Sequence, residues 1–514
     1  MYARVKIKLT KTAFFLFCIT AISLAYRARG ITQSYPFWVD EFSSASQATQ
    51  ILNHGFSFFT SSYHPELNNI MTHFIIALSF SLFGVSEYAA RLPFVVVGAL
   101  VPLAIYILAR RYFDTGVALM SALLTACSYF LIVWSRQARG YSLQALLTIG
   151  MISYYLSLRN KKLTIGNITT FISIAVVGLL THSIFILVLL AVALDALYIR
   201  LKRPIGSGQT TWLLLTISGI TVLLFAIFFG YVNVLTSSIL GRLFQTNNLW
   251  YYHSFLWREY GLISFLGFIG LVIAFQKQRS IVRPILIFIG LQLIFICFIW
   301  PPYTSRYLIT IFPFLFIGVA VSIRKLVKPM FAGVVIVILI IANGHKFVPK
   351  PKVYYSINHD FREISNVDYN EIYAIIKGKG LIKEGKTAVI DTWHDRLFWY
   401  MGQSYPAAYL FRWIDGSDRI NGLAQHTDYS LNTRGEKNIP DRPSLRFIGE
   451  LSDLKRAIQA YPRGFLLVDD SSLPTDVLEY AQKNFKKELY IERYPLDDNP
   501  YSIWPTTLYS WGIK

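Results

Sequence analysis

The sequence predicts an α-helical membrane protein that crosses the bilayer about eleven times and continues into a separate C-terminal α/β domain. Of its 514 residues, 54% are hydrophobic and only 15% are charged, whereas soluble domains usually carry about 25% charged residues. Apolar runs of about 17 to 25 residues, each long enough to cross ~30 Å of hydrocarbon, recur until about residue 345. After residue 346 charged residues become frequent, which marks a change of domain.

The first apolar run, residues 12–27, follows a basic head with the sequence MYARVKIKLTK. This pairing resembles a signal peptide. However, no small-residue cleavage site clearly ends the run, and Arg27 and Arg29 follow it directly. We therefore predict an uncleaved first helix with its N-terminus in the cytoplasm.

Ten further spans are predicted, and the apolar segment 68–84 is the ambiguous one. The predicted spans are 92–109, 116–134, 141–158, 163–180, 183–199, 211–232, 261–275, 283–300, 307–323 and 330–344. If 68–84 does not cross, the basic loops ARRYF, LRNKK, IRLKRP, QKQRS and RKLVK all lie in the cytoplasm. If it crosses, all five lie outside, against the positive-inside rule. We therefore predict that 68–84 is an interfacial or re-entrant helix.

This topology predicts a multi-pass plasma-membrane protein with a transmembrane domain, 1–345, and an external domain, 346–514. Most of the unusual polar residues then lie on the outer face, in segments 31–91, 134–141, 181–183, 233–260 and 301–307. In the C-terminal domain, the strand patterns TAVIDTW and GFLLVDD alternate with the helical patterns DLKRAIQAYP and PTDVLEYAQKNFKKEL. Such alternation is typical of an α/β domain.

The net charge of +20 does not indicate nucleic-acid binding, because the basic residues form short clusters between apolar runs rather than one polar face. The three cysteines, Cys18, Cys127 and Cys297, all lie inside apolar runs. Neither a disulfide framework nor a cysteine-based metal site is therefore indicated.

Asp40 and Glu41 form an acidic pair at the predicted outer surface. Such an acid is a general base, a metal ligand or a hydrated loop charge. Two features favour a function: the pair follows the aromatic sequence YPFW, and it precedes FSSASQATQILNHG, which reads as an amphipathic helix on the interface. A helix that begins near Asp40 would hold its carboxylate beside free N–H groups.

Arginines form the second candidate group on the outer face. They are Arg91, Arg136, Arg139 with the nearby Tyr141, and Arg306 between Tyr303 and Tyr307. Arginines at the ends of spans often only extend to the lipid headgroups. Positive charge is nevertheless depleted on the outer side, so the presence of arginines there, opposite an acid, indicates a function beyond contact with headgroups. A guanidinium binds phosphate in a bidentate fork, and a lipid-linked donor carries phosphate at the membrane surface.

Two histidines are weaker candidates, because a lone histidine at a helix end is more often structural than catalytic. They are His64 in SYHPELNN and His182 in LLTHSIF. His64 with Glu66 or Glu41 could hold a metal, but the spacing matches no specific zinc signature. The residues therefore leave a divalent metal open.

The order of these elements resembles the GT-C membrane glycosyltransferases of the dolichyl-phosphate-mannose-protein mannosyltransferase and aminoarabinose transferase type. The resemblance rests on WVDE with ATQILNHG, then YHPEL and FGVSEYAARLP, then SRQARGYSL, and finally SRYL with FP, over about residues 1–345. It implies a GT-C fold whose large first external loop carries interfacial helices.

The resemblance also implies roles for single positions. Asp40, with Glu41 beside it, occupies the place of the family's essential acid, and Arg91 corresponds to the arginine of its RLP element. Arg139 and Tyr141 of ARGY correspond to residues for the donor phosphate or sugar. Many members have His-Pro-Pro-Leu where this chain has His64-Pro65-Glu66-Leu67, so the exact role of that turn is left open. The predicted substrate-binding residues are Arg91, Arg139, Tyr141, His64, Glu66, Tyr303, Arg306 and His182.

Together these observations predict an enzyme that moves a sugar from a polyprenyl-phosphate donor to a protein, lipid or glycan acceptor at the outer face. Asp40 would be the general base of an inverting displacement, and Arg91, Arg139 and Arg306 would stabilise the leaving phosphate without a metal. The alternatives are a polymerase or ligase of lipid-linked glycans, a transporter with mid-membrane charges, and a structural scaffold.

Overall fold

The computed structural model divides into two compact units. The helical unit comprises Met1–Thr32, Glu66–Gly84 and Tyr88–Lys350, and the sheet unit comprises Gln33–Pro65, Val85–Glu87 and Pro351–Lys514. The residues that the structure describes are 2–31, 37, 39–55, 69–159, 164–202, 219, 247–300, 304–342, 353–355, 363–365, 368–380, 382–402, 404–411, 417–418, 423–424, 430–432, 435–439, 442–469, 473–495 and 503–513.

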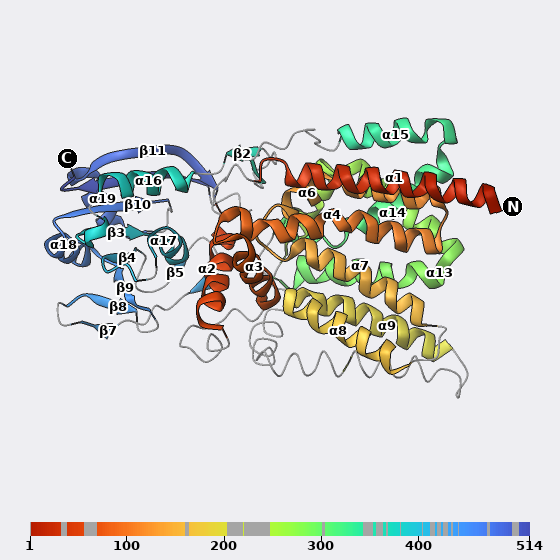
Figure 1. The fold of residues 1–514 in the computed structure, drawn as a ribbon, viewed down its shortest axis with the longest axis horizontal. Coiled ribbons are helices and arrows are strands. Elements are labelled where there is room, and N and C mark those ends of the chain that lie inside the picture. Colours follow the sequence, from red (N-terminus) through yellow and green to blue (C-terminus); the bar gives the residue numbers. More distant parts are fainter. Residues whose placement is uncertain are drawn as a thin grey trace. The chain divides into compact units, whose positions relative to one another are not determined.

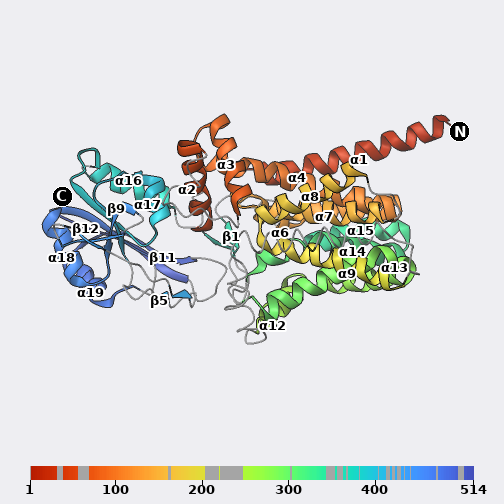
Figure 2. The same cartoon turned by 90° about the horizontal axis from the view of Figure 1, so that it is seen from below.

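Long apolar helices lie side by side in the helical unit (Figures 1 and 2). Their bounds are α1 Tyr2–Ala28, α3 Ile70–Phe83, α4 Glu87–Tyr112, α5 Thr115–Cys127, α6 Tyr129–Ser135, α7 Tyr141–Leu158, α8 Ile165–Thr181, η3 Ser183–Phe185, α9 Ile186–Lys202, α12 Leu249–Ser254, η6 Phe255–Glu259, α13 Gly261–Phe298, η7 Ser305–Leu308, α14 Phe312–Leu326 and α15 Pro329–Ala342. The predicted class, a polytopic helical membrane protein, is confirmed. The predicted span 211–232, apart from Gly219, lies outside the described residues.

Three of the described helices are individually long and apolar enough to cross a membrane: α4, Ser183–Lys202 and α13. The pair α5 and α6, bent by 56°, gives a fourth if it counts as one span. Shorter apolar helices in the described ranges are Thr12–Ala28 in α1, α3, α8 and Pro329–Ile341 in α15. Of these four, all but α3 coincide in position with predicted spans.

The helix α13 is a hairpin of two helices. Its backbone breaks at Gln278, which has a φ of −133° and a ψ of 48°. Before the break Gly267 lies against Leu315 of α14, and after it Phe288 packs on Phe314, with ring centroids 5.9 Å apart. A straight helix would separate Gly267 from Phe288 by about 30 Å, so the chain must turn back. The break confirms two separate helices where spans 261–275 and 283–300 were predicted.

Glycines allow α13 and α14 to approach each other closely. A Cβ atom on Gly270 would overlap the carbonyl oxygen of Gly318, and one on Gly318 would overlap the carbonyl oxygen of Gly267. Small residues at such contacts let membrane helices pack backbone against backbone. This packing fixes α14, and therefore also η7, which immediately precedes it in the chain.

The ambiguous segment 68–84 forms α3. Asn69 precedes this helix and Gly84 ends it, so its 14 residues are bounded on both sides. At 1.5 Å per residue the helix is about 21 Å long, which is shorter than the ~30 Å hydrocarbon core. Helix α15 has the same number of residues, so length does not distinguish α3 from a predicted span, and the prediction that 68–84 does not cross stays a prediction.

An eight-stranded sheet forms the core of the sheet unit, with the order β11-β12-β10-β3-β4-β9-β8-β7. The strands are β3 Thr387–Asp391, β4 Ala408–Phe411, β7 Ser430–Leu431, β8 Lys437–Ile439, β9 Arg442–Ile448, β10 Arg463–Val468, β11 Lys486–Pro495 and β12 Ile503–Trp511. The four central strands, β10, β3, β4 and β9, are parallel. Two small ribbons accompany the sheet, β1 Val353–Tyr355 with β2 Glu363–Ser365, and β5 Ser417–Asp418 with β6 Leu423–Ala424. The predicted α/β domain is confirmed.

Helices cover both faces of the sheet. The helices of this unit are α2 Val39–His54, α16 Tyr369–Lys379, η8 Ile382–Glu384, α17 His394–Met401, α18 Leu451–Ala460 and α19 Thr475–Asn484. Of these, α2 packs on α17. On one face Leu454 of α18 and Val477 of α19 belong to the same buried cluster as Ile390 of β3. The next residue, Asp391, points to the opposite face, where it bonds to Tyr373 of α16.

One boundary in this domain was predicted wrongly. The helical pattern at 474–489 ends as a helix at Asn484, and β11 begins at Lys486. Residues 486–495 pair antiparallel with β12, with irregularities in the register after Lys487 and after Ile491. Sheet pairing therefore overrides the helical propensity of these lysine and glutamate residues.

Candidate active site

Predicted site residues from three separate loops converge around Tyr141, in the helical unit. The guanidinium carbon of Arg139 lies 6.0 Å from the centroid of the Tyr141 ring, and that of Arg306 lies 5.9 Å from it. The His182 ring lies 6.3 Å from the rings of both Tyr141 and Tyr307. Tyr141 is only 3% exposed and Arg139 only 9%. We call Arg139, Tyr141, His182 and Arg306 the Tyr141 cluster.

Two contacts hold the bent pair α5 and α6 on α1, one at the bend and one at the turn that carries Arg139. Arg27 of α1 donates a hydrogen bond to the carbonyl of Ala126, 3.1 Å away and next to the bend. Arg136, directly after α6, donates to the carbonyl of Arg29 at 2.8 Å. These two contacts fasten the end of α1 to α5 and α6. Arg136, one of the external arginines of the sequence, therefore anchors the turn.

Gly140, in the ARGY sequence, is the tightest point of the turn. A Cβ atom at this position would overlap the hydroxyl of Thr72 and lie 2.9 Å from the methyl group of Thr181. The contacts place α3 and the end of α8 directly against the turn. Helix α7 begins at the next residue, so the positive end of its macrodipole lies beside Arg139.

Three side chains that the sequence argument missed hold η7 and its Arg306. The backbone N–H of Thr304 donates to the hydroxyl of Tyr252 at 3.2 Å. The amide of Gln292 donates to the carbonyl of Tyr307, and Trp300 Nε1 donates to the hydroxyl of the same tyrosine at 3.0 Å. Gln292 carried a signal in the sequence, because a lone amide inside an apolar span needs a partner.

Within the Tyr141 cluster, His182 has a structural role as well. Its Nδ1 accepts a hydrogen bond from the backbone N–H of Ile184 at 3.2 Å, so the ring caps the short helix η3. A neutral imidazole that accepts through Nδ1 carries its proton on Nε2. The cap fixes the ring that faces Tyr141.

Arg91 lies in the helical unit, on α4, and is fully buried. Pro93, two residues later, lies inside the same helix and cannot bond to the carbonyl of Ala89. The hydroxyl of Ser79 in α3 donates to that carbonyl instead, at 2.5 Å. The RLP element is therefore a proline-interrupted helical turn that α3 supports.

The acidic pair lies on α2, in the sheet unit. Asp40 and Glu41 occupy the first turn of the helix, which confirms the predicted helix start. Asp40 is partly exposed, whereas Glu41 is completely buried. Phe42, predicted to lie on an amphipathic helix at the interface, packs on Tyr369 of α16, with ring centroids 6.0 Å apart.

The remaining predicted residues, His64, Glu66 and Tyr303, lie outside the described residues. Within the described part of the chain, no three His, Cys, Asp or Glu side chains are grouped as a metal ion would require.

Comparison with known proteins gives one family match. Residues 64–231, about a third of the chain, match the family described as dolichyl-phosphate-mannose-protein mannosyltransferase. Among curated proteins, no sequence matches the chain.

Solved structures with a similar fold cover nearly the whole chain. ArnT from Cupriavidus metallidurans in the apo state is 13% identical, with a TM-score of 0.57, over 99% of this chain and 98% of that protein. ArnT bound to undecaprenyl phosphate is 13% identical, with a TM-score of 0.50, over 98% and 97% of the two chains.

An archaeal protein has a similar fold over a smaller share of this chain. Oligosaccharyltransferase AglB from Archaeoglobus fulgidus, in complex with an inhibitory peptide and a dolichol-phosphate, is 12% identical, with a TM-score of 0.50. The similarity covers 77% of this chain and 64% of AglB, so the chain spans less than two thirds of that protein. At such identities the structures show a shared fold. With the family match, they confirm the resemblance predicted from the sequence.

Proposed function

We propose that this chain, which has the GT-C fold, transfers a sugar from a polyprenyl-phosphate donor to an acceptor at the outer face of the plasma membrane. The Tyr141 cluster carries this proposal. Arg139 and Arg306 place two guanidinium groups within about 6 Å of one tyrosine ring, beside the N-terminus of α7. This arrangement concentrates positive charge from two loops and one helix N-terminus, which suits a phosphate group at the end of a lipid chain.

The proposed reaction assigns a role to each of the residues predicted from the sequence. Asp40 takes the proton of the acceptor hydroxyl or amine, whose oxygen or nitrogen then forms a bond to the anomeric carbon of the sugar. The bond between that carbon and the phosphate oxygen breaks, and polyprenyl phosphate leaves. Arg139, Arg306 and Arg91 stabilise the negative charge that grows on the phosphate. In this role the arginines replace a divalent metal, and a single displacement inverts the anomeric centre.

Two related proteins support the donor class. The matched family takes its name from a dolichyl-phosphate sugar donor, and the ArnT fold has been solved with undecaprenyl phosphate bound. The donor proposed for this chain therefore carries a polyprenyl phosphate, and membrane lipid surrounds its hydrocarbon tail. Proteins, lipids and glycans are the proposed acceptor classes.

A mass-spectrometric comparison of envelope glycans and lipids tests the function. Cells that lack the gene should accumulate a polyprenyl-phosphate sugar, and an acceptor should lack one sugar residue. Restoring the gene should reverse both changes, whereas the Asp40→Asn variant should reverse neither. A loss of polymer length would support a glycan polymerase instead. Identical profiles in the presence and absence of the gene would contradict the proposed transfer.

The proposed orientation predicts which side chains face outward. The exposed Asn247 lies in the external segment 233–260, and the exposed Gln276 lies in the basic QKQRS loop. In intact cells, an impermeant maleimide should label Asn247→Cys but not Gln276→Cys when the three native cysteines are replaced by serine. Labelling of Gln276→Cys alone would overturn the orientation.

A further inference from the structure

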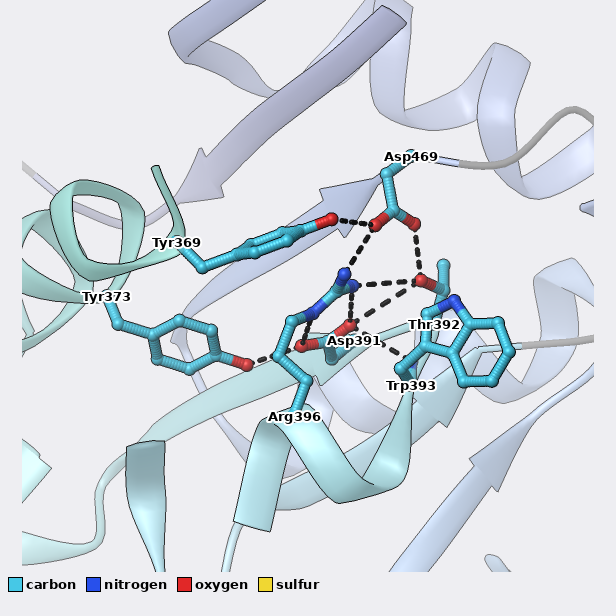
Figure 3. A network of polar contacts seen from close by, with 7 residues as sticks. All are labelled: Tyr369, Tyr373, Asp391, Thr392, Trp393, Arg396 and Asp469. Atoms are coloured by element: carbon cyan, nitrogen blue, oxygen red, sulfur yellow. Dashed lines mark hydrogen bonds and ion pairs between the residues drawn. The ribbon is translucent and has the colours of Figure 1, made fainter. Parts of the chain in front are cut away.

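A buried charged network lies in the sheet unit, at the carboxyl ends of two adjacent parallel strands (Figure 3). Asp391 ends β3 and Asp469 follows β10, and both side chains are completely buried. Arg396 of α17, 1% exposed, lies between them. Its Nε donates to Asp391 at 3.0 Å and its Nη1 donates to Asp469 at 2.6 Å.

Two tyrosines of α16 complete the network. Tyr369 donates its hydroxyl to Asp469 at 3.0 Å, and Tyr373 donates to Asp391. Burial, followed by the charge of Asp391, raises the pKa of Tyr373, which keeps this hydroxyl protonated as a donor. The Arg396 guanidinium also lies over the Tyr369 ring, 4.2 Å from its centroid. The carboxylates therefore fix both rings from one side.

The opposite sides of these rings contact α2 and its neighbours. The Tyr373 ring stacks on Tyr400 of α17, with centroids 4.3 Å apart and an interplanar angle of 18°. Phe42 of α2 packs on Tyr400 and on Tyr369, with centroid separations of 5.8 Å and 6.0 Å. Phe37, just before α2, packs on Trp399 at 5.0 Å. These aromatic contacts therefore lie on both sides of Asp40 in the sequence, three residues before it at Phe37 and two residues after it at Phe42.

The same cluster reaches the beginning of α4. The hydroxyl of Tyr400 donates to Glu87 Oε1 at 3.3 Å, and the amide of Asn370 donates to the same oxygen at 3.5 Å. Burial and the charge of Glu87 raise the pKa of Tyr400, so its hydroxyl also stays protonated. Glu87 is the first residue of α4, one helical turn before Arg91.

The network offers a way to fix the geometry of the residues around it. A buried ion pair is often replaced by apolar side chains without loss of stability, whereas its charges and hydrogen bonds restrict geometry. The carboxyl ends of parallel strands on either side of a reversal in strand order usually bind a ligand. Here an arginine from the protein's own α17 fills that position, and its partners lead to α2.

We infer that the Asp391, Arg396 and Asp469 network, acting through Tyr369, Tyr373 and Tyr400, positions the first turns of α2 and α4 for transfer. This inference rests on the proposed function, because it makes the sheet domain the support for Asp40 and for the turn before Arg91. The residues named are positioning residues, and they act through Phe42 and Glu87.

Removing the Phe42 ring tests this inference in the full-length protein reconstituted in vesicles. Phe42→Ala should lower the transfer rate by about 10- to 100-fold, because small misplacements of a reacting group have large effects. Donor affinity should stay within about twofold, since the phosphate is assigned to arginines. Phe42→Tyr keeps the ring and should retain most of the activity.

A matched control lies in the same domain. Phe485 stacks on Trp511, with centroids 5.0 Å apart, but belongs to the α18 and α19 face of the sheet. Phe485→Ala also removes a ring contact, yet it should leave the transfer rate almost unchanged. Hydrogen exchange should show faster exchange of α2 amides in Phe42→Ala than in Phe485→Ala, with β3 and β10 protected in both variants.

A second variant removes a single hydrogen bond without opening a cavity. Tyr400→Phe keeps the stacked ring and deletes only the hydroxyl that reaches Glu87, and it should lower the transfer rate several-fold. If Phe42→Ala and Tyr400→Phe both transfer like Phe485→Ala, the positioning inference is wrong although the function stands. A wild-type protein without transfer activity would instead remove the proposed function itself.

Discussion

Replacing Asp40 with asparagine should lower the transfer rate by about 10²–10⁴, the usual range for loss of a positioned general base. Asparagine keeps the shape and an acceptor oxygen but cannot take a proton. Donor binding should survive, because the phosphate is assigned to arginines and not to Asp40. Transfer rate and donor affinity, measured separately on the purified protein, distinguish the two effects.

Glu41 provides the matched control for this prediction. Its side chain is completely buried, whereas Asp40 is partly exposed, so only Asp40 is open to an acceptor. Glu41→Gln should therefore reduce the transfer rate less than Asp40→Asn. If Glu41→Gln is inactive and Asp40→Asn turns over normally, the base is assigned one residue away from its true position. If both variants are active, neither carboxylate is the general base and the proposed mechanism is wrong.

Arg139→Lys should lose about 10- to 100-fold in transfer rate although the charge remains. A lysine ammonium is a single point charge and cannot reproduce the two parallel bonds of a guanidinium to phosphate. The loss should appear mainly in kcat, because charge on the leaving phosphate grows in the transition state. Steady-state kinetics with varied donor concentration measure this division between kcat and KM.

Arg110 serves as the control for Arg139→Lys. Arg110, in the last turn of that helix, is exposed and belongs to a predicted cytoplasmic loop. Arg110→Lys makes the same chemical change and should leave turnover at the wild-type value. Equal turnover in Arg139→Lys and the wild type would remove Arg139 from the phosphate site.

Much of the fold was predictable from the sequence, because apolar length and charge placement report directly on spans and loops. The basic sequence around Gln278 predicted the break that makes α13 a hairpin, and TAVIDTW predicted β3. Contacts between distant segments left weaker signals. Asp391 and Asp469 end two predicted strands, but the strand patterns alone do not show that these strands are neighbours. The boundary after Asn484 failed because pairing with β12 is a tertiary effect.

The candidate site was predictable to a similar degree. Loops assigned to one face supplied Arg139, Tyr141, His182 and Arg306, and the structure brings these four together. The residues that hold them were not found, because Tyr252 and Trp300 look like ordinary aromatic residues of an apolar sequence. The packing of α2 on the sheet domain was also missed, because residues 39–54 carry no sequence signal for a contact with residues more than 300 positions away.

That packing has a consequence for synthesis of the chain. Tyr369, in the helix that receives Phe42, follows the end of α2 at His54 by 315 residues. At about 5–20 residues per second, a ribosome needs about 15 to 60 s to make this interval. Throughout that time the helix that carries the acidic pair has no sheet domain to pack on. In the proposed enzyme, the general base Asp40 therefore reaches its final place only after much of the sheet domain has been translated.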